Sequence, residues 1–220
     1  MTPKQLVEQD GYAFLPSFFP DIDSTAAALA LGSPEQVEGL CLVHELLPTP
    51  TDLTTPNTYS GNFGLGAFPL HTDLAHWARP PRYLMLRCSH GDANTKTQIV
   101  DSRVLIESLG SSVLARCLVR PRRPLKGTLQ LLPILQVTSK SDMPIIRWDS
   151  IYLKPANDFA TEVFQRIDTR LSSTQPVTKV LLNRGDTLLL DNWRLLHGRS
   201  QVQNIESSRR IHRLYLRCLT

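Results

Sequence analysis

The sequence predicts a mainly β fold of the sandwich, barrel or jelly-roll type with a few flanking helices. Many short apolar or alternating runs are bounded by glycine, proline, asparagine or charged residues, which is typical of strands. The 16 prolines are scattered, which favours short elements over long helices. No G-x-G-x-x-G follows a strand, and no G-x-x-x-x-G-K-[ST] loop is present, so a nucleotide-binding α/β fold is disfavoured.

Size and composition fit one globular domain. The chain has 220 residues, of which 41% are hydrophobic and 20% are charged. We expect a single domain over 1–220, with a short lid or insert near 120–150. No apolar run approaches the ~20 residues of a membrane span, and the first residues lack the build of a signal peptide. We therefore expect a cytoplasmic monomer or homodimer with its four cysteines reduced.

The charge balance is mild. The formal net charge is +4, which permits an anionic ligand but does not require nucleic acid. The one dense basic stretch is interrupted by prolines and lacks interleaved aromatic residues, so we interpret it as a solvated loop (Arg120, Arg122, Arg123 and Lys126). We expect neither a nucleic-acid nor a membrane partner.

Individual elements follow from local patterns. A helix over 24–31 begins with Ser-Thr and contains good helix formers, and a helix over 102–109 follows Asp101 as a candidate N-cap. A third helix, over 155–172, repeats apolar residues at spacings of three and four. Strands are expected over 83–88, 97–101, 128–137, 179–183, 186–192 and 213–219.

Two separated histidine segments point to metal chemistry. In FPLHTDLAHW, His71 and Asp73 are two residues apart, and on an extended strand they would share one face. His197 lies far downstream, in the segment that follows a buried strand. Two imidazoles and one carboxylate leave about three open positions on an octahedral metal, which is the pattern of non-haem Fe(II) oxygenases. No C-x-x-C pair is present, so structural zinc is disfavoured.

The C-terminal run RRIHRLYLR (209–217) places several arginines on a candidate strand. If 213–219 is a strand, Arg213, Tyr215 and Arg217 share one face. A guanidinium directed into a buried site requires an anion, and its planar fork suits a carboxylate. The alternative is an exposed edge strand that its basic residues protect from pairing.

Four blocks together resemble a known family. They are LHTDLAHWARPPRYLMLRC (70–88), TQIVD (97–101), GDTLLLDNWRLLHGRS (185–200) and RRIHRLYL (209–216). In this order they are similar to the taurine dioxygenase/2,4-dichlorophenoxyacetate dioxygenase family of Fe(II)- and 2-oxoglutarate-dependent oxygenases, which includes clavaminate synthase-like enzymes. The resemblance extends from about residue 59 to the C-terminus.

The resemblance implies a double-stranded β-helix, a cupin-like jelly roll. It also implies Fe(II) bound by His71, Asp73 and His197, with 2-oxoglutarate and O₂ as co-substrates. A threonine on the strand after the H-x-D segment would contact 2-oxoglutarate; Thr97 matches that position and Thr95 is the alternative.

The same resemblance assigns roles to the arginines. Arg209 matches the residue that binds the distal carboxylate of 2-oxoglutarate, with Arg210 as the alternative if the register slips by one. Arg213 matches a residue that faces an anionic group of the primary substrate. Independently of the resemblance, Arg199 stands two residues after His197 and is expected to be a structural hydrogen-bond donor that fixes a ligand loop. From its place in IIRWD, Arg147 could reach a substrate carboxylate or pair with Asp149 on the surface.

The activity that follows from the resemblance is oxidation of a small carboxylate-bearing molecule, such as an amino acid, by hydroxylation in the first instance. Relatives that halogenate lack the metal-binding carboxylate, so Asp73 disfavours halogenation. Asn62 and Tyr59 precede the metal segment and are further substrate contacts; His76 and Trp77 could line the pocket. Two alternatives stay open: a catalytically silent jelly-roll binding module, and an oxygenase that acts on a macromolecule.

Overall fold

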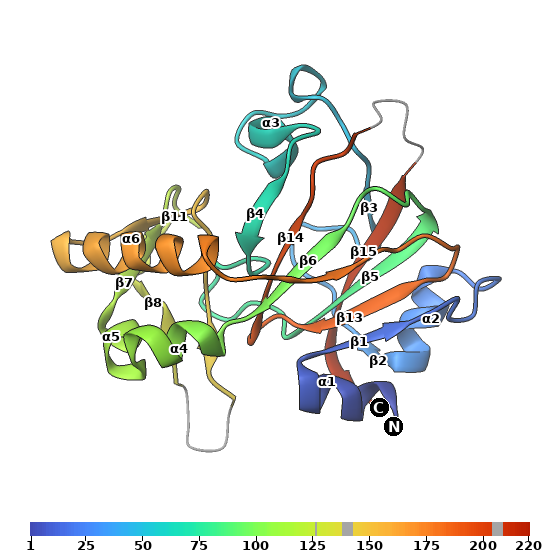
Figure 1. The fold of residues 1–220 in the computed structure, drawn as a ribbon, viewed down its shortest axis with the longest axis horizontal. Coiled ribbons are helices and arrows are strands. Elements are labelled where there is room, and N and C mark those ends of the chain that lie inside the picture. Colours follow the sequence, from blue (N-terminus) through green and yellow to red (C-terminus); the bar gives the residue numbers. More distant parts are fainter. Residues whose placement is uncertain (126, 138–142, 204–208) are drawn as a thin grey trace.

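Two antiparallel sheets packed face to face form the centre of the molecule in this computed structural model, which describes residues 1–125, 127–137, 143–203 and 209–220 (Figure 1). The larger sheet has the order β1-β13-β5-β15-β2, and β3 also pairs with β15. Its strands are β1 (Tyr12–Leu15), β13 (Thr187–Asp191), β5 (Tyr83–His90), β15 (Arg210–Leu219), β2 (Gly32–Pro34) and β3 (His44–Leu46). The smaller sheet has the order β12-β6-β14-β4, with bounds Val177–Lys179, Thr97–Asp101, Leu195–Arg199 and Phe68–His71. This arrangement confirms the predicted jelly-roll core.

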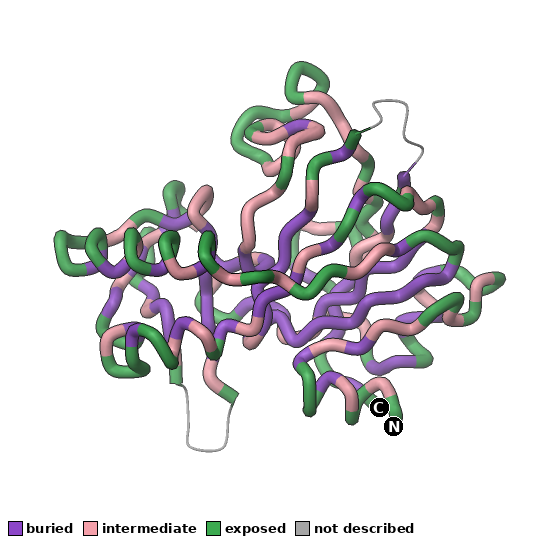
Figure 2. Tube along the Cα trace, viewed as in Figure 1, coloured by how far each residue is buried: buried purple, intermediate pink, exposed green. Residues whose placement is uncertain are grey.

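Helices cover the outside of both sheets. Residues of α1 and α2, Val7, Ala28 and Leu31 among them, pack on the outer face of the larger sheet against Leu189 and Leu214. A second apolar cluster packs in part of the space between the two sheets, and the buried strands stand out in Figure 2. The helices are α1 (Pro3–Asp10), α2 (Ser24–Leu31), α3 (Tyr59–Phe63), α4 (Arg103–Leu109), α5 (Ser111–Arg116) and α6 (Asp158–Ser172), with a 3₁₀ turn at Thr51–Leu53.

A lateral lobe extends from the smaller sheet. Helices α4, α5 and α6 pack there against short strands around Trp148 (Figure 1). These strands are β7 (Leu118–Pro121), β8 (Leu132–Pro133), β9 (Leu135–Gln136), β10 (Ile145–Ile146) and β11 (Leu153–Pro155). Part of the segment expected to form a lid or insert, residues 126 and 138–142, lies outside the described residues, as does Lys126 of the basic stretch.

Most predicted elements are confirmed within a few residues, including all three helices. Two strands are corrected. The strand expected over 128–137 is two short strands, because the pairing partner changes at Ile134: its N–H donates to Cys117 beside β7, and its carbonyl accepts the N–H of Arg147 beside β10. The strand expected over 179–183 ends at Lys179, because the N–H groups of Leu182 and Asn183 donate to Asp186 in a turn. The N-cap of α4 is Ser102, although Asp101 still accepts the N–H of Arg103.

Helix α1 is an element that the sequence analysis did not predict, although its signals are local. Thr2 and Gln5 form a reciprocal capping box, and Pro3 opens the helix. No helix in the described part of the chain is long and apolar enough to cross a bilayer.

Candidate metal centre

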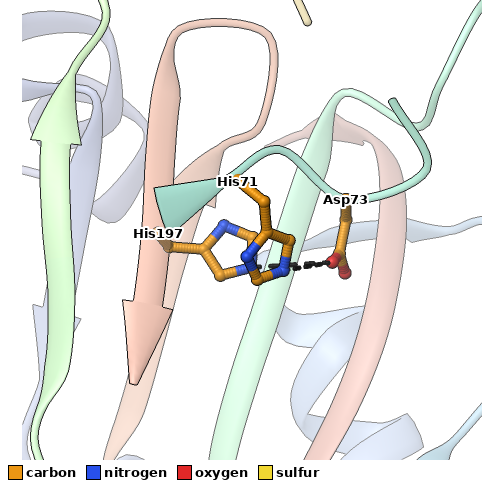
Figure 3. A group of neighbouring side chains, drawn as sticks. All are labelled: His71, Asp73 and His197. Carbon is orange, nitrogen blue, oxygen red and sulfur yellow. Dashed lines mark ion pairs between the residues drawn. The ribbon is translucent and has the colours of Figure 1, made fainter. Parts of the chain in front are cut away.

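The three predicted ligands converge at the edge of the smaller sheet (Figure 3). His71 ends β4 and His197 lies on β14, where the two residues are direct cross-strand partners. Nε2 of His71 lies 3.5 Å and Nε2 of His197 lies 3.6 Å from Oδ1 of Asp73. All three side chains are buried, and one ligand atom from each lies within 4.8 Å of the others. The sequence prediction that these residues come together is confirmed.

Asp73 reaches the site by a different route from the one expected. Strand β4 ends at His71, so Asp73 is not on the same strand face but in the following turn. Asn192 holds that turn: its side-chain oxygen accepts the N–H of Asp73 at 2.7 Å, and its amide donates to the carbonyl of Asp73 at 3.0 Å. The N–H of Thr72 donates to the carbonyl of Trp148, which fixes the start of the same turn. The turn therefore depends on contacts with distant segments.

The donor set fits a divalent transition metal. Nδ1 of His71 donates to the carbonyl of Pro69 at 2.9 Å, a contact that leaves the Nε2 lone pair directed at Asp73 and His197. Burial lowers the pKa of His197, which favours its neutral, ligating form. Two imidazoles and one carboxylate suit Fe(II) and leave positions open for other ligands.

The second oxygen of Asp73 is held by the larger sheet. Oδ2 accepts a hydrogen bond from the Tyr215 hydroxyl at 2.8 Å and one from Arg213 Nη1 at 3.2 Å. Burial acts to raise the pKa of Asp73, but Arg213 and the two imidazoles lower it well below its usual range. Arg213 also donates to Nδ1 of His44 at 3.1 Å. The carboxylate is thus ionised, and its Oδ2 is held by two donors from β15.

The triad opens into a cavity of about 990 Å³ between the sheets. Thr97 on β6 and Arg209 just before β15 both line it, and both are buried. Arg199 lines the same cavity; burial and the neighbouring charge of Arg209 lower its pKa to about 10. Two buried guanidinium groups therefore lie in this part of the cavity, and their planar forks suit a carboxylate.

The alternatives for two of these positions lie elsewhere. Arg210 is exposed and does not line the cavity; its side chain pairs at 3.4 Å with Glu45, which does. The Thr95 hydroxyl donates to Asp92 at 2.7 Å, and Thr95 does not line the cavity. Of each pair, therefore, it is Arg209 and Thr97 that face the space beside the triad.

Arg147 is a correction. Its side chain is fully buried, and its guanidinium donates to the carbonyls of Pro133, Ala75, Trp77 and Ala78 and to the Gln136 side chain. It does not line the cavity, and in the described part of the chain it forms no ion pair with Asp149. Arg147 therefore joins the metal-segment turn to the lateral lobe and cannot bind substrate.

The other predicted contacts lie at the cavity. Asn62 lines it from α3, with its amide donating to the carbonyl of Thr58 at 2.7 Å. His76 and Trp77 are also in the lining. Arg199 is a structural hydrogen-bond donor, as expected: it donates to the carbonyls of Gly64 and Gly66 at 2.8 and 2.7 Å, in the segment that precedes β4.

Sequence reasoning missed Asp149 as a cavity residue. Asp149 is 2% exposed and lines the cavity near His71. Its Oδ1 accepts the N–H groups of Ile151 and Tyr152, and burial raises its pKa. Tyr59 lies beside it, with its ring stacked on His71 at 4.3 Å between centroids. The only local signal was an Asp after a buried strand, which is too common to single out.

His44 and Tyr215 were missed for a related reason. The sequence does not single out His44, yet it lines the cavity and contacts Arg213. Tyr215 was placed on the same strand face as Arg213, but its partner Asp73 is 142 residues away in the sequence. A pattern of neighbouring residues in the sequence does not predict a contact between residues so far apart.

The sequence matches no protein-family model. Solved structures are similar over nearly the whole chain. An asparagine oxygenase in complex with Fe(II), 2S,3S-3-hydroxyasparagine and succinate superposes with a TM-score of 0.71 at 21% identity, covering 96% of this chain and 76% of that one. The non-haem iron oxygenase OrfP, in complex with (3S)-hydroxy-L-Arg, gives 0.68 at 19% identity over 96% and 76%. PvcB from Pseudomonas aeruginosa gives 0.69 at 18% identity over 97% and 78%.

The chain has the fold of these oxygenases. At these levels of identity the likeness establishes the fold alone.

Proposed function

We propose that this protein is an Fe(II)- and 2-oxoglutarate-dependent dioxygenase that hydroxylates a small molecule of the amino-acid type. The observation that carries the proposal is the convergence of His71, Asp73 and His197 at the wall of a cavity that also exposes Thr97 and Arg209. A bound Fe(II) would couple decarboxylation of 2-oxoglutarate to succinate and CO₂ with the transfer of one oxygen atom of O₂ to a C–H bond.

The residues around the triad supply binding and orientation. Arg209 would pair with the distal carboxylate of 2-oxoglutarate, and the Thr97 hydroxyl would donate a hydrogen bond to it. Arg199 adds positive charge at the same end of the cavity. Because these groups are buried, a carboxylate there would be held without competition from bulk water.

The cavity also suggests what the substrate carries. Asp149 is a buried carboxylate that forms no ion pair within the described chain, so an ammonium, guanidinium or amide group would complete its contacts. Arg213 remains a candidate for a substrate carboxylate, and Asn62 for a further polar contact. An amino acid with a hydrogen-bond-donating side chain fits this combination. Two of the similar structures contain hydroxylated asparagine and arginine, which supports this class.

The test is anaerobic absorbance spectroscopy of the purified protein as Fe(II) and then 2-oxoglutarate are added. We expect a visible charge-transfer band that requires both additions, is lost in His71→Ala and persists in His90→Ala, a control histidine that is exposed. Arg209→Met should raise the 2-oxoglutarate concentration needed for the band at least tenfold.

Substrate class is tested by succinate release across a panel of amino acids. Asp149→Asn should lower kcat/KM for the best substrate at least tenfold while leaving the Fe(II)·2-oxoglutarate band unchanged. A folded parent protein that shows no band with Fe(II) and 2-oxoglutarate would contradict the enzyme proposal and favour a jelly-roll binding module.

A further inference from the structure

We propose that Tyr215 is a positioning residue for the metal: with Arg213 it holds Oδ2 of Asp73 so that only Oδ1 is available as a ligand. This inference rests on the proposed function, because it assigns a role toward the same metal. Tyr215 does not belong to the H-x-D segment or to the arginine pair, and it lies on a strand of the opposite sheet.

The two oxygens of Asp73 have different partners. Oδ1 lies 3.5 and 3.6 Å from the Nε2 atoms of His71 and His197. Oδ2 is turned away from them and accepts hydrogen bonds from Tyr215 at 2.8 Å and from Arg213 at 3.2 Å. Asn192 holds the backbone of Asp73 from both sides. The carboxylate therefore cannot rotate without breaking both of its contacts from β15.

Tyr215 is placed for this contact and not merely for packing. It is 5% exposed and belongs to the apolar cluster between the sheets, with Leu84 and Leu190. A phenol buried among apolar side chains needs a hydrogen-bond partner. Within the described chain that partner is Oδ2 of Asp73. Phenylalanine would fill the same space without this contact.

The consequence concerns how many metal positions stay open. A carboxylate can bind a metal through one oxygen or through both. Binding through both would take a position that 2-oxoglutarate or O₂ needs, since two histidines and one carboxylate oxygen leave about three of six. By engaging Oδ2, Tyr215 and Arg213 keep Asp73 a one-oxygen ligand. Partners of this kind typically change metal affinity about 10–100-fold when they are removed.

The experiment compares Tyr215→Phe with Tyr83→Phe in the full chain. Tyr83 lies on the neighbouring strand β5, opposite Leu216, and packs with the outer cluster, so its substitution makes the same chemical change outside the site. Anaerobic Mn(II) binding is followed by electron paramagnetic resonance, and 2-oxoglutarate binding to the Mn(II)-loaded protein by calorimetry. Thermal unfolding checks that both variants are folded.

For Tyr215→Phe we expect Mn(II) affinity at least tenfold weaker, weaker 2-oxoglutarate binding, and a shifted Fe(II)·2-oxoglutarate charge-transfer band. Tyr83→Phe should match the parent in all three. Arg213→Met provides a second variant that removes the other donor to Oδ2, and its Mn(II) affinity should fall in the same direction.

Mn(II) and 2-oxoglutarate affinities of Tyr215→Phe within twofold of the parent, with an unshifted band, would overturn the inference while leaving the proposed function intact. A folded parent that binds neither Mn(II) nor Fe(II) would instead overturn both. The two failures are thus distinguishable by the behaviour of the parent alone.

Discussion

Arg147 shows how one arginine can stabilise a turn that carries a metal ligand. Its guanidinium donates hydrogen bonds to the carbonyls of Ala75, Trp77 and Ala78, which follow Asp73 closely in the chain. It also donates to the carbonyl of Pro133 in the lateral lobe. Burial lowers its pKa to about 10, so the group is still charged at neutral pH. The charge is dispersed over neutral carbonyl dipoles instead of one carboxylate.

Replacing Arg147 by methionine should lower the free energy of unfolding by about 3 kcal/mol or more. The change keeps much of the apolar stem but leaves several buried carbonyls without a donor, each costing about 1–3 kcal/mol. Urea unfolding followed by circular dichroism measures the effect. Arg166→Met, an exposed change on α6, is the control and should stay within about 0.5 kcal/mol of the parent. Equal stabilities for the two variants would contradict this role.

At the scale of the element, the pairing of β4 with β14 decides where the two histidines meet. His197 is opposite His71, but the register shifts before Arg199, which is opposite Phe68. Gly198 lies at this irregularity, and a Cβ there would meet the carbonyl oxygen of Phe68 at 2.7 Å. That oxygen belongs to the backbone, so it cannot move without moving the strand.

Gly198→Ala should therefore weaken metal binding as well as stability. We expect a loss of about 1–3 kcal/mol in the free energy of unfolding and at least tenfold weaker Mn(II) binding, because β4 must shift relative to His197. Gly110→Ala is the matched control: it sits between α4 and α5 at φ +86° with open space around it, so it costs stability from the backbone alone. Metal affinities that fall equally in both variants would count against the steric explanation.

The site residues differ in whether the sequence alone predicts them. His71, Asp73 and His197 were identified because their signals are local: a two-residue spacing and a histidine after a buried strand. Asn192 and Tyr215 were not, because they meet Asp73 only when turns and strands 119 and 142 residues away pack against it. Arg147 was misassigned because the sequence around a buried arginine looks the same whether its guanidinium donates to backbone carbonyls or binds a substrate carboxylate. Helix α6 was predicted from the sequence to within three residues, because its apolar residues repeat at helical spacing; the structure shows Asn157 as its N-cap.

At the scale of the whole molecule, an ion-pair network around Asp101 joins β6, α4 and α1. Asp101 ends β6 and accepts hydrogen bonds from Arg103 of α4 and from Arg194, which follows β13. Arg194 also donates to the carbonyls of Glu8 and Gln9 in α1. Burial acts to raise the pKa of Asp101, but the two arginines lower it overall.

Asp101 should make stability depend on pH. A lowered folded-state pKa stabilises the native state above the unfolded-state value of about 3.9, and that contribution is lost as the pH falls through the folded-state pKa. Asp101→Asn should therefore reduce the free energy of unfolding by about 1–2 kcal/mol at pH 7, with a gap to the parent that narrows below about pH 4. Denaturant unfolding at several pH values measures it. The exposed Asp21→Asn should show no such gap, and a gap for Asp101→Asn that persists unchanged at pH 3 would refute the linkage.

Strand β4 lies at the outer edge of its sheet, and among the strands that the structure describes it pairs only with β14. His71, the last residue of β4, and His197 on the neighbouring β14 are both candidate ligands. A metal ion bound to both would therefore hold β4 against β14 from the cavity side. Chelation would then do more than stop turnover. Stripping the ion should loosen β4, speed amide hydrogen–deuterium exchange there before anywhere else in the sheet, and lower the melting temperature, whereas saturation at about 100 times Kd would add about 2.7 kcal/mol. Iron supply would in that way set how long the folded protein persists.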